Sequence, residues 1–208
     1  MYKFPYYTEP DNEKVIAFMK ENAFAVITGI GENYPVATQI PLSIEIKEGK
    51  IFLHGHIMRK TDHHLAFEKN NNVLVLFTGP HCFVSASWYT NPSVGSTWNY
   101  MTVQVKGKIS FTDEAGTLKA VKAVSDTYEG TRSAGAFDSL PKEYVDHMVK
   151  AIVGFSIEVE TMENTFKLSQ NRDAASQRNI IEQLKKRGDY NSLMIAEEME
   201  QRINQLTD

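Results

Sequence analysis

The chain is poor in cysteine and has no long apolar run. Its 208 residues contain one cysteine, Cys82, so no internal disulfide can form, and no Cys/His spacing typical of a zinc site occurs. No segment approaches the ~20 consecutive apolar residues that cross a bilayer. The first residues, MYKFPYYTEPD, lack the apolar core of a signal peptide. We therefore expect a cytoplasmic protein with no membrane segment.

A basic surface is also missing. The chain has 22 Lys plus Arg against 26 Asp plus Glu, which gives a net charge of −4 at pH 7. A protein that neutralises DNA phosphates needs clustered cations. The densest basic cluster, residues 185–187, has Asp189 and Glu197 close by, and no helix-turn-helix pattern is visible. The charge balance makes direct DNA binding doubtful.

Apolar alternation predicts an α+β fold that is mainly β. Expected helices cover residues 8–22, 61–70, 113–128, 141–151 and 174–206, with the last broken near Gly188. We expect one domain over residues 1–172 and a C-terminal helical extension over 173–208. A turn at Glu163 and Asn164 should separate the last two of the expected strands, which are 24–28, 36–46, 51–57, 73–77, 82–85, 100–109, 152–162 and 165–168.

One loop combines aromatic rings with small polar groups. It lies between the strands that end at Ser85 and begin at Tyr100, and it contains both tryptophans, Trp88 and Trp98. Ring faces beside hydroxyl and amide groups suit a flat ligand with polar edges. The alternative is an aromatic corner that closes a β-barrel, because Trp and Tyr are also common in protein interiors.

A second segment has the character of an anion site. Arg59, Lys60 and Thr61 lie where an expected strand leads into a helix, and a helix N-terminus, a guanidinium and an ammonium all favour phosphate. A solvated basic turn is the alternative. Histidines at 54, 56, 63 and 64 also suggest a metal site. No nearby cysteine or acidic cluster completes a tetrahedral set of ligands, so we predict no metal site.

Four motifs occur in an order that resembles one family. They are GPHCFVSASWY at 79–89, TWNY at 97–100, IVGF at 152–155 and KLSQNR at 167–172. Together they resemble the PaiB-type FMN-binding negative transcriptional regulator family, and His-Gly-His at 54–56 with Arg59 is similar to its Gly-His motif. That family belongs to the FMN-binding split β-barrel group, which includes pyridoxamine 5′-phosphate oxidase. Ala86 departs from the pattern, as do Met58 and residues 60–62.

The resemblance implies a fold, a cofactor and a partner. It implies a six-stranded antiparallel split β-barrel with flanking helices, a homodimer, and FMN bound at the dimer interface. On this reading the phosphate is bound near the Gly-His motif, the ring edge meets small polar groups, a tryptophan covers the ring face, and the KLSQNR segment completes the pocket across the dimer. The implied cofactor-binding residues are His56, Arg59, Lys60, Thr61, Ser85, Ser87, Trp88, Trp98, Asn99, Thr102, Gln170 and Arg172.

Three functions remain open on the sequence. The first is a PaiB-like flavin-binding transcriptional regulator. The second is an FMN-dependent oxidoreductase acting on a small-molecule substrate, in which the cofactor performs the chemistry. The third is a non-catalytic binder of FMN or haem. No side chain is identified as catalytic; His81, beside the aromatic loop, is the nearest candidate for an acid or base.

Overall fold

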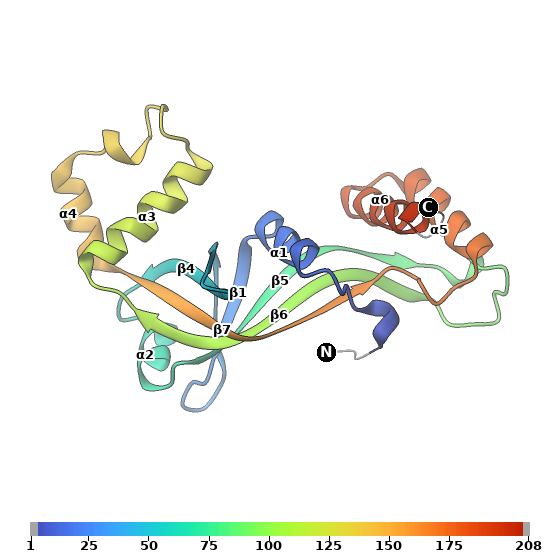
Figure 1. The fold of residues 1–208 in the computed structure, drawn as a ribbon, viewed down its shortest axis with the longest axis horizontal. Coiled ribbons are helices and arrows are strands. Elements are labelled where there is room, and N and C mark those ends of the chain that lie inside the picture. Colours follow the sequence, from blue (N-terminus) through green and yellow to red (C-terminus); the bar gives the residue numbers. More distant parts are fainter. Residues whose placement is uncertain (1–3, 206–208) are drawn as a thin grey trace. The chain divides into compact units, whose positions relative to one another are not determined.

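The computed structural model describes residues 4–205 as an α+β fold. Within this range seven strands form one antiparallel sheet in the order β2-β1-β5-β6-β7-β4-β3. Figure 1 shows the neighbouring long strands β5, β6 and β7. The strands are β1 Phe24–Gly29, β2 Val36–Pro41, β3 Ser43–Lys47, β4 Lys50–Met58, β5 Asn72–Val84, β6 Thr97–Phe111 and β7 Ile152–Lys167. The α-helices are α1 Asn12–Glu21, α2 Asp62–Lys69, α3 Glu114–Tyr128, α4 Lys142–Ala151, α5 Ala174–Arg187 and α6 Tyr190–Gln205, and short 3-10 turns are η1 Pro5–Tyr7, η2 Ala86–Trp88 and η3 Phe137–Ser139.

The chain divides into two compact units. We call residues 19–77 and 104–162 the barrel unit, and residues 4–18, 78–103 and 163–205 the C-terminal unit. The long strands β5, β6 and β7 contribute to both. The domain boundary predicted between residues 172 and 173 stays a prediction.

The predicted count of six strands is wrong, because the described residues form seven. Residues 36–46 were expected to be one strand, but the chain breaks at Leu42 into β2 and β3. β2 pairs with β1, whereas β3 pairs with β4. Leu42 donates its N–H to Ala23 O at 2.9 Å, and Pro41 before it has no N–H to continue a ladder. The two halves therefore join different partners.

Two other expected strand boundaries are absent. β5 runs unbroken through Gly79 and Pro80, and β7 runs unbroken through Glu163 and Asn164. β1 pairs only with residues 73–76 of β5, so Pro80 lies beyond this pairing. Proline has no N–H to donate, so it does not interrupt a strand at a position where no neighbouring strand requires that hydrogen bond.

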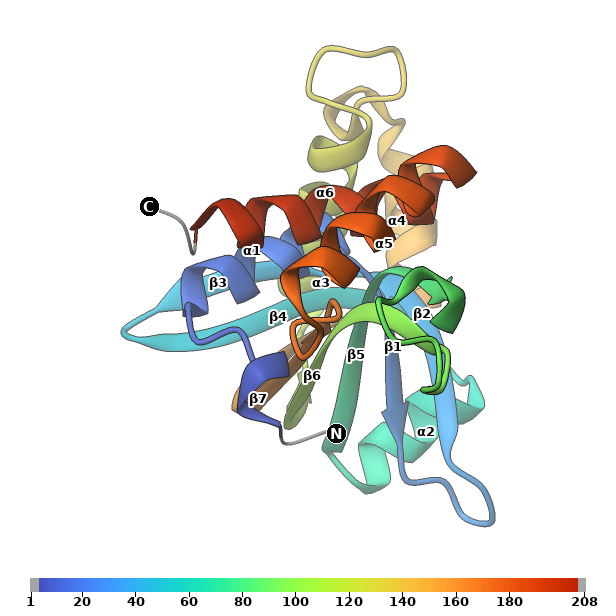
Figure 2. The same ribbon diagram turned by 90° about the vertical axis from the view of Figure 1, so that its right-hand side faces the viewer.

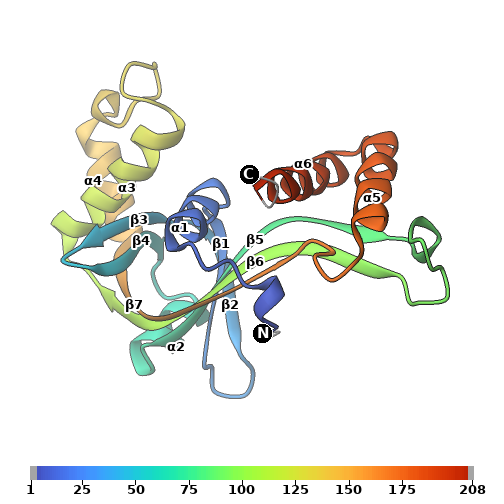
Figure 3. The ribbon, with the colours of Figure 1, turned by 45° about the vertical axis from the view of Figure 1, so that its right-hand side comes forward.

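The sheet of the barrel unit curls until strands near its two edges touch. A Cβ added to Gly55 of β4 would lie 3.0 Å from a Leu42 methyl and 3.4 Å from the Ile40 methyl of β2. Figures 2 and 3 show the β1–β2 and β3–β4 hairpins on this curled sheet. Inward-facing residues of the unit are buried, and include Ala25, Ile27, Leu53, Ile57, Val73, Val75, Phe77, Val105, Ile109, Val153, Phe155 and Ile157.

The helices expected at residues 61–70 and 113–128 begin at side-chain caps. Thr61 caps α2 by accepting from His64 N, and Asp113 caps α3 by accepting from Gly116 N. α3 and α4 lie side by side (Figure 1). Gly154 of β7 approaches α3 so closely that an added Cβ would lie 2.8 Å from Thr117 Cα. No helix within residues 4–205 is long and apolar enough to cross a membrane.

The C-terminal unit is held by a helical pair and by an ion pair whose carboxylate is buried. α5 and α6 pack together, and Gly188 ends α5 with a φ of 76°, as predicted for a break at this glycine. Glu9 is 7% exposed and accepts from Arg202 of α6 at 2.7 Å. Asn164 joins the same contact by exchanging two hydrogen bonds with the Glu9 backbone. These bonds connect the N-terminal segment, β7 and α6.

Gly55→Val tests the closure of the sheet. The added Cβ would lie 2.9 Å from Phe155, 3.0 Å from Leu42 and, across the closure, 3.4 Å from Ile40 of β2. We expect a loss of about 1–3 kcal/mol in unfolding free energy, as is typical of overpacked cores. Chemical denaturation measures the change. Gly95→Val is the control, since Gly95 has no atom within 4 Å of an added Cβ; equal stability of the two variants would contradict the contact.

Candidate functional site

The turn between β4 and α2 has a constrained backbone. Lys60 has a φ of 62°, a left-handed conformation that non-glycine residues rarely adopt. Its N–H donates to His64 Nδ1 at 3.3 Å, and the preceding Arg59 N–H donates to Ala151 O at 2.9 Å. The Thr61 hydroxyl donates to Met58 O at 3.0 Å. The backbone from Met58 to Thr61 is therefore fixed on several sides.

Two cationic side chains on this turn are available to a ligand. Arg59 and Lys60 are exposed, and neither side chain has a hydrogen-bond or ion-pair partner among the described residues. The helix N-terminus beside them is less open than the sequence suggests. His63 N donates to Asp62 Oδ1 at 2.7 Å and His64 N to Thr61 Oγ1 at 3.4 Å. The side chains, rather than the helix N–H groups, are thus the available donors for an anion.

His56 contributes an unsatisfied polar atom in the same unit. It lies on β4 opposite Gly154, and its Nδ1 is buried with no hydrogen-bond partner in the described chain. Burial lowers the pKa of His56 below its ordinary value, so the imidazole is neutral at pH 7. A neutral ring with a free nitrogen can donate to or accept from a ligand.

The remaining histidines of this region have partners of their own. His54 Nε2 lies 2.8 Å from Glu45, and His63 Nδ1 lies 3.1 Å from Asp62. His64 is buried and contacts the ring of Phe111 at 4.9 Å between centroids. Across residues 4–205, no three His, Cys, Asp or Glu side chains come together in a group that could hold a metal ion.

The aromatic loop is held by helix α5 within the C-terminal unit. Asn179 donates to Trp88 O at 2.8 Å, and the Arg187 guanidinium lies 4.9 Å from the Trp88 ring centroid. Ser176 accepts from Thr90 N at 2.9 Å. Neither Asn179 nor Arg187 was predicted to be involved. Asn179 lies 91 residues from Trp88 along the chain and Arg187 lies farther, and no local pattern connects them with the loop.

Small polar groups begin this loop. Ser85 caps η2 by accepting from Ser87 N, and the two serine hydroxyls lie 2.8 Å apart. Ser87 is exposed. These hydroxyls therefore form a linked pair with remaining capacity for a polar ligand edge.

Trp98 is a more exposed aromatic surface than Trp88. It is 54% exposed and packs edge to face on Phe83 at 6.1 Å between centroids, with the His81 ring at 6.2 Å. Lys167 holds the backbone of this region by donating to Trp98 O at 2.7 Å and to the Thr97 hydroxyl. Burial, and then the charge of Arg172, lowers the pKa of Lys167. Lys167 was not predicted as a site residue, although it begins the KLSQNR motif.

The other predicted residues of this unit have structural contacts. Asn99 is fully buried, accepts from the Ser169 hydroxyl at 3.0 Å and donates weakly to Met199 Sδ. Gln170 turns back on its own segment, where Oε1 accepts from Leu168 N and Nε2 donates to Phe166 O. Arg172 stacks on Tyr89 at 4.3 Å, and Thr102 is half-buried on β6. Ser169 has a φ of 62°, so this segment also contains a left-handed non-glycine residue.

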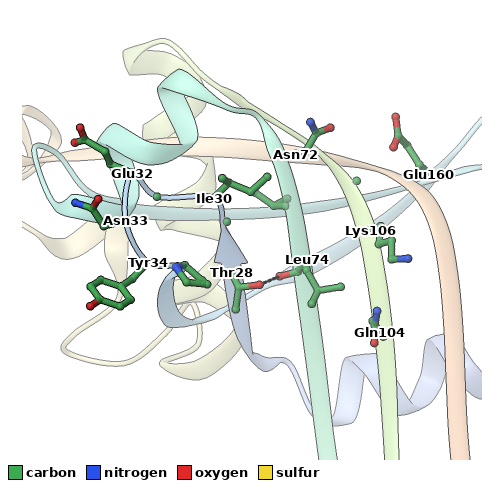
Figure 4. Close-up of a pocket in the computed structure, with 15 residues that line it drawn as sticks. Thr28, Ile30, Glu32, Asn33, Tyr34, Asn72, Leu74, Gln104, Lys106 and Glu160 are labelled. Atoms are coloured by element: carbon green, nitrogen blue, oxygen red, sulfur yellow. Dashed lines mark hydrogen bonds between the residues drawn. The ribbon is translucent and has the colours of Figure 1, made fainter. Parts of the chain in front are cut away.

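A pocket of about 670 Å³ lies on the barrel unit beside the β1–β2 loop (Figure 4). Leu74 and Ile30 contribute apolar surface, and Thr28 donates to Leu74 O at 3.4 Å. Gln104 and Lys106 reach the pocket from β6. The side chain of Lys106 is exposed and has no partner within the described range. None of the twelve predicted residues lines this pocket, although strict alternation along β6 places Gln104 and Lys106 on its outward face.

Thiol chemistry does not suit the single cysteine. Cys82 is 4% exposed, and burial raises the pKa of its thiol to about 11. The thiolate, which is the nucleophilic form, is therefore scarce at neutral pH. His81 is exposed beside Trp98, and its one hydrogen-bond contact within residues 4–205 is a long one with Gly79 O, at 3.4 Å.

Comparisons with known proteins agree with the sequence resemblance. A family model described as "Putative FMN-binding domain" matches residues 1–161. The chain is 33% identical to "Protease synthase and sporulation protein PAI 2" of Bacillus subtilis, over 98% of each chain.

Solved structures share the fold at low sequence identity. A FAD and heme binding protein from Mycobacterium smegmatis matches with a TM-score of 0.61 and 14% identity, covering 83% of this chain and 78% of the other. The flavocytochrome Anf3 from Azotobacter vinelandii matches with a TM-score of 0.56 and 14% identity, covering 80% and 72%. At this identity the likeness concerns the fold alone.

The chemistry of the barrel unit fits a phosphorylated flavin. It offers two unpaired cations on a constrained turn and an imidazole nitrogen that lacks a partner among the described residues. The family match covers most of the chain, and the relative from B. subtilis is aligned over nearly all of it. The chain belongs to the PaiB-type FMN-binding family of the split β-barrel group, and its cofactor is FMN.

Proposed function

We propose that this chain is an FMN-binding regulator of the PaiB-like type in which Arg59 and Lys60 bind the cofactor phosphate. The observation that carries the proposal is that both cationic side chains are unpaired within the described chain, on a turn whose backbone is fixed by His64, Ala151 and Met58. A phosphate would supply the missing acceptors, and hydrogen bonds between charged partners are stronger than neutral ones. The unsatisfied Nδ1 of His56 supports a further polar contact.

The other predicted residues divide into ligand and supporting roles in this proposal. Ser85, Ser87 and Trp98 retain open hydroxyl or ring surface, so they suit contacts with the flavin ring. Asn99 and Gln170 are already bonded within the protein, so they suit support of the segment. Contributions of Trp88, Thr102 and Arg172 from the C-terminal unit belong to the same proposal. The homodimer implied by the family resemblance stays a prediction.

A regulatory role is supported by the relative rather than by a DNA-binding surface. The B. subtilis protein is named for protease synthesis and sporulation. In the C-terminal basic cluster, Lys185 pairs with Glu200 at 2.6 Å, and Arg187 donates to Phe83 O at 2.9 Å. Lys185 is thus neutralised and Arg187 is engaged by the protein, while Lys186 is exposed and without a partner among the described residues, so the cluster offers no row of free cations to a polyanion. Regulation would then act through flavin, a metabolite or another protein.

A second candidate function is an FMN-dependent oxidoreductase. The pocket in Figure 4 favours it, because a volume of about 670 Å³ suits a small molecule. Lys106 would pair with an acidic group, and Gln104 offers amide hydrogen bonds beside the apolar surface of Leu74. Bound FMN would supply the electron chemistry.

The phosphate assignment predicts a difference between FMN and riboflavin. Arg59→Ala and Lys60→Ala should each weaken FMN binding by about 10- to 100-fold, as expected for a lost charged hydrogen bond. Riboflavin lacks the phosphate, so its affinity should stay nearly unchanged. Titration by flavin fluorescence measures both affinities. Lys69→Ala, which removes a charge at the far end of α2, is the control, and a parallel loss for both flavins would refute the assignment.

The charge distribution predicts weak DNA binding. With a net charge of −4, the chain should bind a random-sequence duplex no more than weakly at about 0.15 M salt, where screening leaves ~8 Å of reach. Fluorescence anisotropy with that duplex and with a pool of genomic fragments measures it. Selective binding below micromolar concentration would contradict the prediction and direct attention to residues 185–187.

The oxidoreductase alternative predicts reduction of the bound flavin. NADPH is a hydride donor with negatively charged phosphates. Under anaerobic conditions it should bleach the absorbance of FMN-loaded protein faster than that of free FMN. Lys106→Met should slow the bleaching by about tenfold, the effect of one lost charged contact. Lys119→Met is the control, because Lys119 is exposed on α3 and does not line the pocket. Bleaching no faster than in free solution would count against this alternative for NADPH.

A further inference from the structure

The left-handed conformation of Lys60 needs a specific support. A lysine with a φ of 62° is strained, and such a residue persists when its surroundings hold it. Among the described residues, only Glu48 and Ser169 are other non-glycine residues with positive φ, and Glu48 lies in the β3–β4 hairpin turn. Lys60 lies between a strand and a helix, so hairpin geometry does not explain its left-handed conformation.

His64 supplies that support from inside the fold. Its Nδ1 lies 3.3 Å from Lys60 N and accepts that N–H, while its ring is 5% exposed and packs on Phe111. An accepting Nδ1 requires the proton to be on Nε2, and Nε2 faces the Glu68 carboxylate at 3.7 Å. The hydrogen bond thus specifies both the ring tautomer and the direction of the Lys60 backbone.

We propose that His64 is the positioning residue of the FMN phosphate site. It acts through the Lys60 backbone and does not touch the cofactor. By fixing the left-handed turn, it holds the side chains of Arg59 and Lys60 in the arrangement that accepts one phosphate. This inference rests on the proposed function, because it assumes that these two side chains bind the phosphate.

The position of the acceptor atom makes the proposal testable. Asparagine presents Oδ1 near the place of the histidine Nδ1, so His64→Asn retains the acceptor for Lys60. Glutamine is polar and longer and reaches toward the place of Nε2, so His64→Gln leaves the Lys60 N–H without its partner. His64→Leu removes both polar positions and keeps the apolar contact with Phe111. If His64→Leu fails to fold, the comparison of Asn with Gln carries the test.

The measurements are the affinities for FMN and riboflavin and the thermal midpoint of each variant. His64→Leu and His64→Gln should bind FMN about tenfold more weakly, the effect of one lost charged contact, while riboflavin affinity is unchanged. His64→Asn should recover most of the FMN affinity. His147→Leu, which changes an exposed histidine of α4, is the matched control and should change neither.

Two outcomes distinguish a failure of the His64 proposal from a failure of the phosphate assignment on which it rests. If Arg59→Ala and Lys60→Ala lower FMN affinity but every His64 variant binds FMN normally, or loses both flavins equally, His64 does not position the phosphate site. If Arg59→Ala and Lys60→Ala leave the preference for FMN over riboflavin intact, the phosphate assignment itself is wrong. A folded His64→Asn that behaves like His64→Gln would also overturn the positioning role.

Discussion

Closure of the barrel unit depends on the chain changing partners at Leu42. The backbone leaves the β1 ladder after Pro41, donates from Leu42 to Ala23 O, and enters the β4 ladder at Ser43. The Leu42 side chain then packs against Gly55, where a larger residue would not fit. The Ile40 methyl of β2 also lies 3.4 Å from the position of a Cβ added to Gly55, so an apolar contact joins strands that lie far apart in the order of the sheet. Without it the sheet would expose the row of apolar side chains that now fills its interior.

The end of β4 and its turn into α2 are fixed by other contacts of the barrel unit. Arg59 N is anchored to Ala151 O at the end of α4, just before β7, and β4 is paired to β7 up to Met58. The short turn to α2 must then reverse direction between a fixed strand and the Thr61 cap, and Lys60 adopts the left-handed conformation there. The strain is confined to Lys60, and it is enforced by the elements around it, β4, β7 and α2. Strained residues held in this way are common at ligand sites.

Sequence reasoning succeeded where a single residue has a local consequence. The caps at Thr61 and Asp113 and the end of α5 at Gly188 follow from side-chain chemistry or backbone freedom within a few residues. It failed where the local structure depends on contacts with residues that are distant in the sequence. The expected turn at Glu163 and Asn164 is absent because Asn164 bonds to Glu9 and β7 continues. Flavin came from the family motifs alone. The motifs also could not reveal that Asn99 is buried, since Ser169 and Met199 surround it through tertiary packing.

The chain must bind an anionic cofactor although its own net charge is −4. Long-range attraction cannot achieve this, so the interaction has to be local and of short range. Some exposed cations elsewhere are neutralised by neighbours, as Lys50 is by Glu158 and Lys185 by Glu200. Arg59 and Lys60 stay unpaired among the described residues, which leaves two adjacent donors in an otherwise acidic protein. Two donors are enough to bind one phosphate, whereas DNA requires a row of them. The same distribution of charge therefore favours a small phosphorylated ligand and disfavours a polyanion.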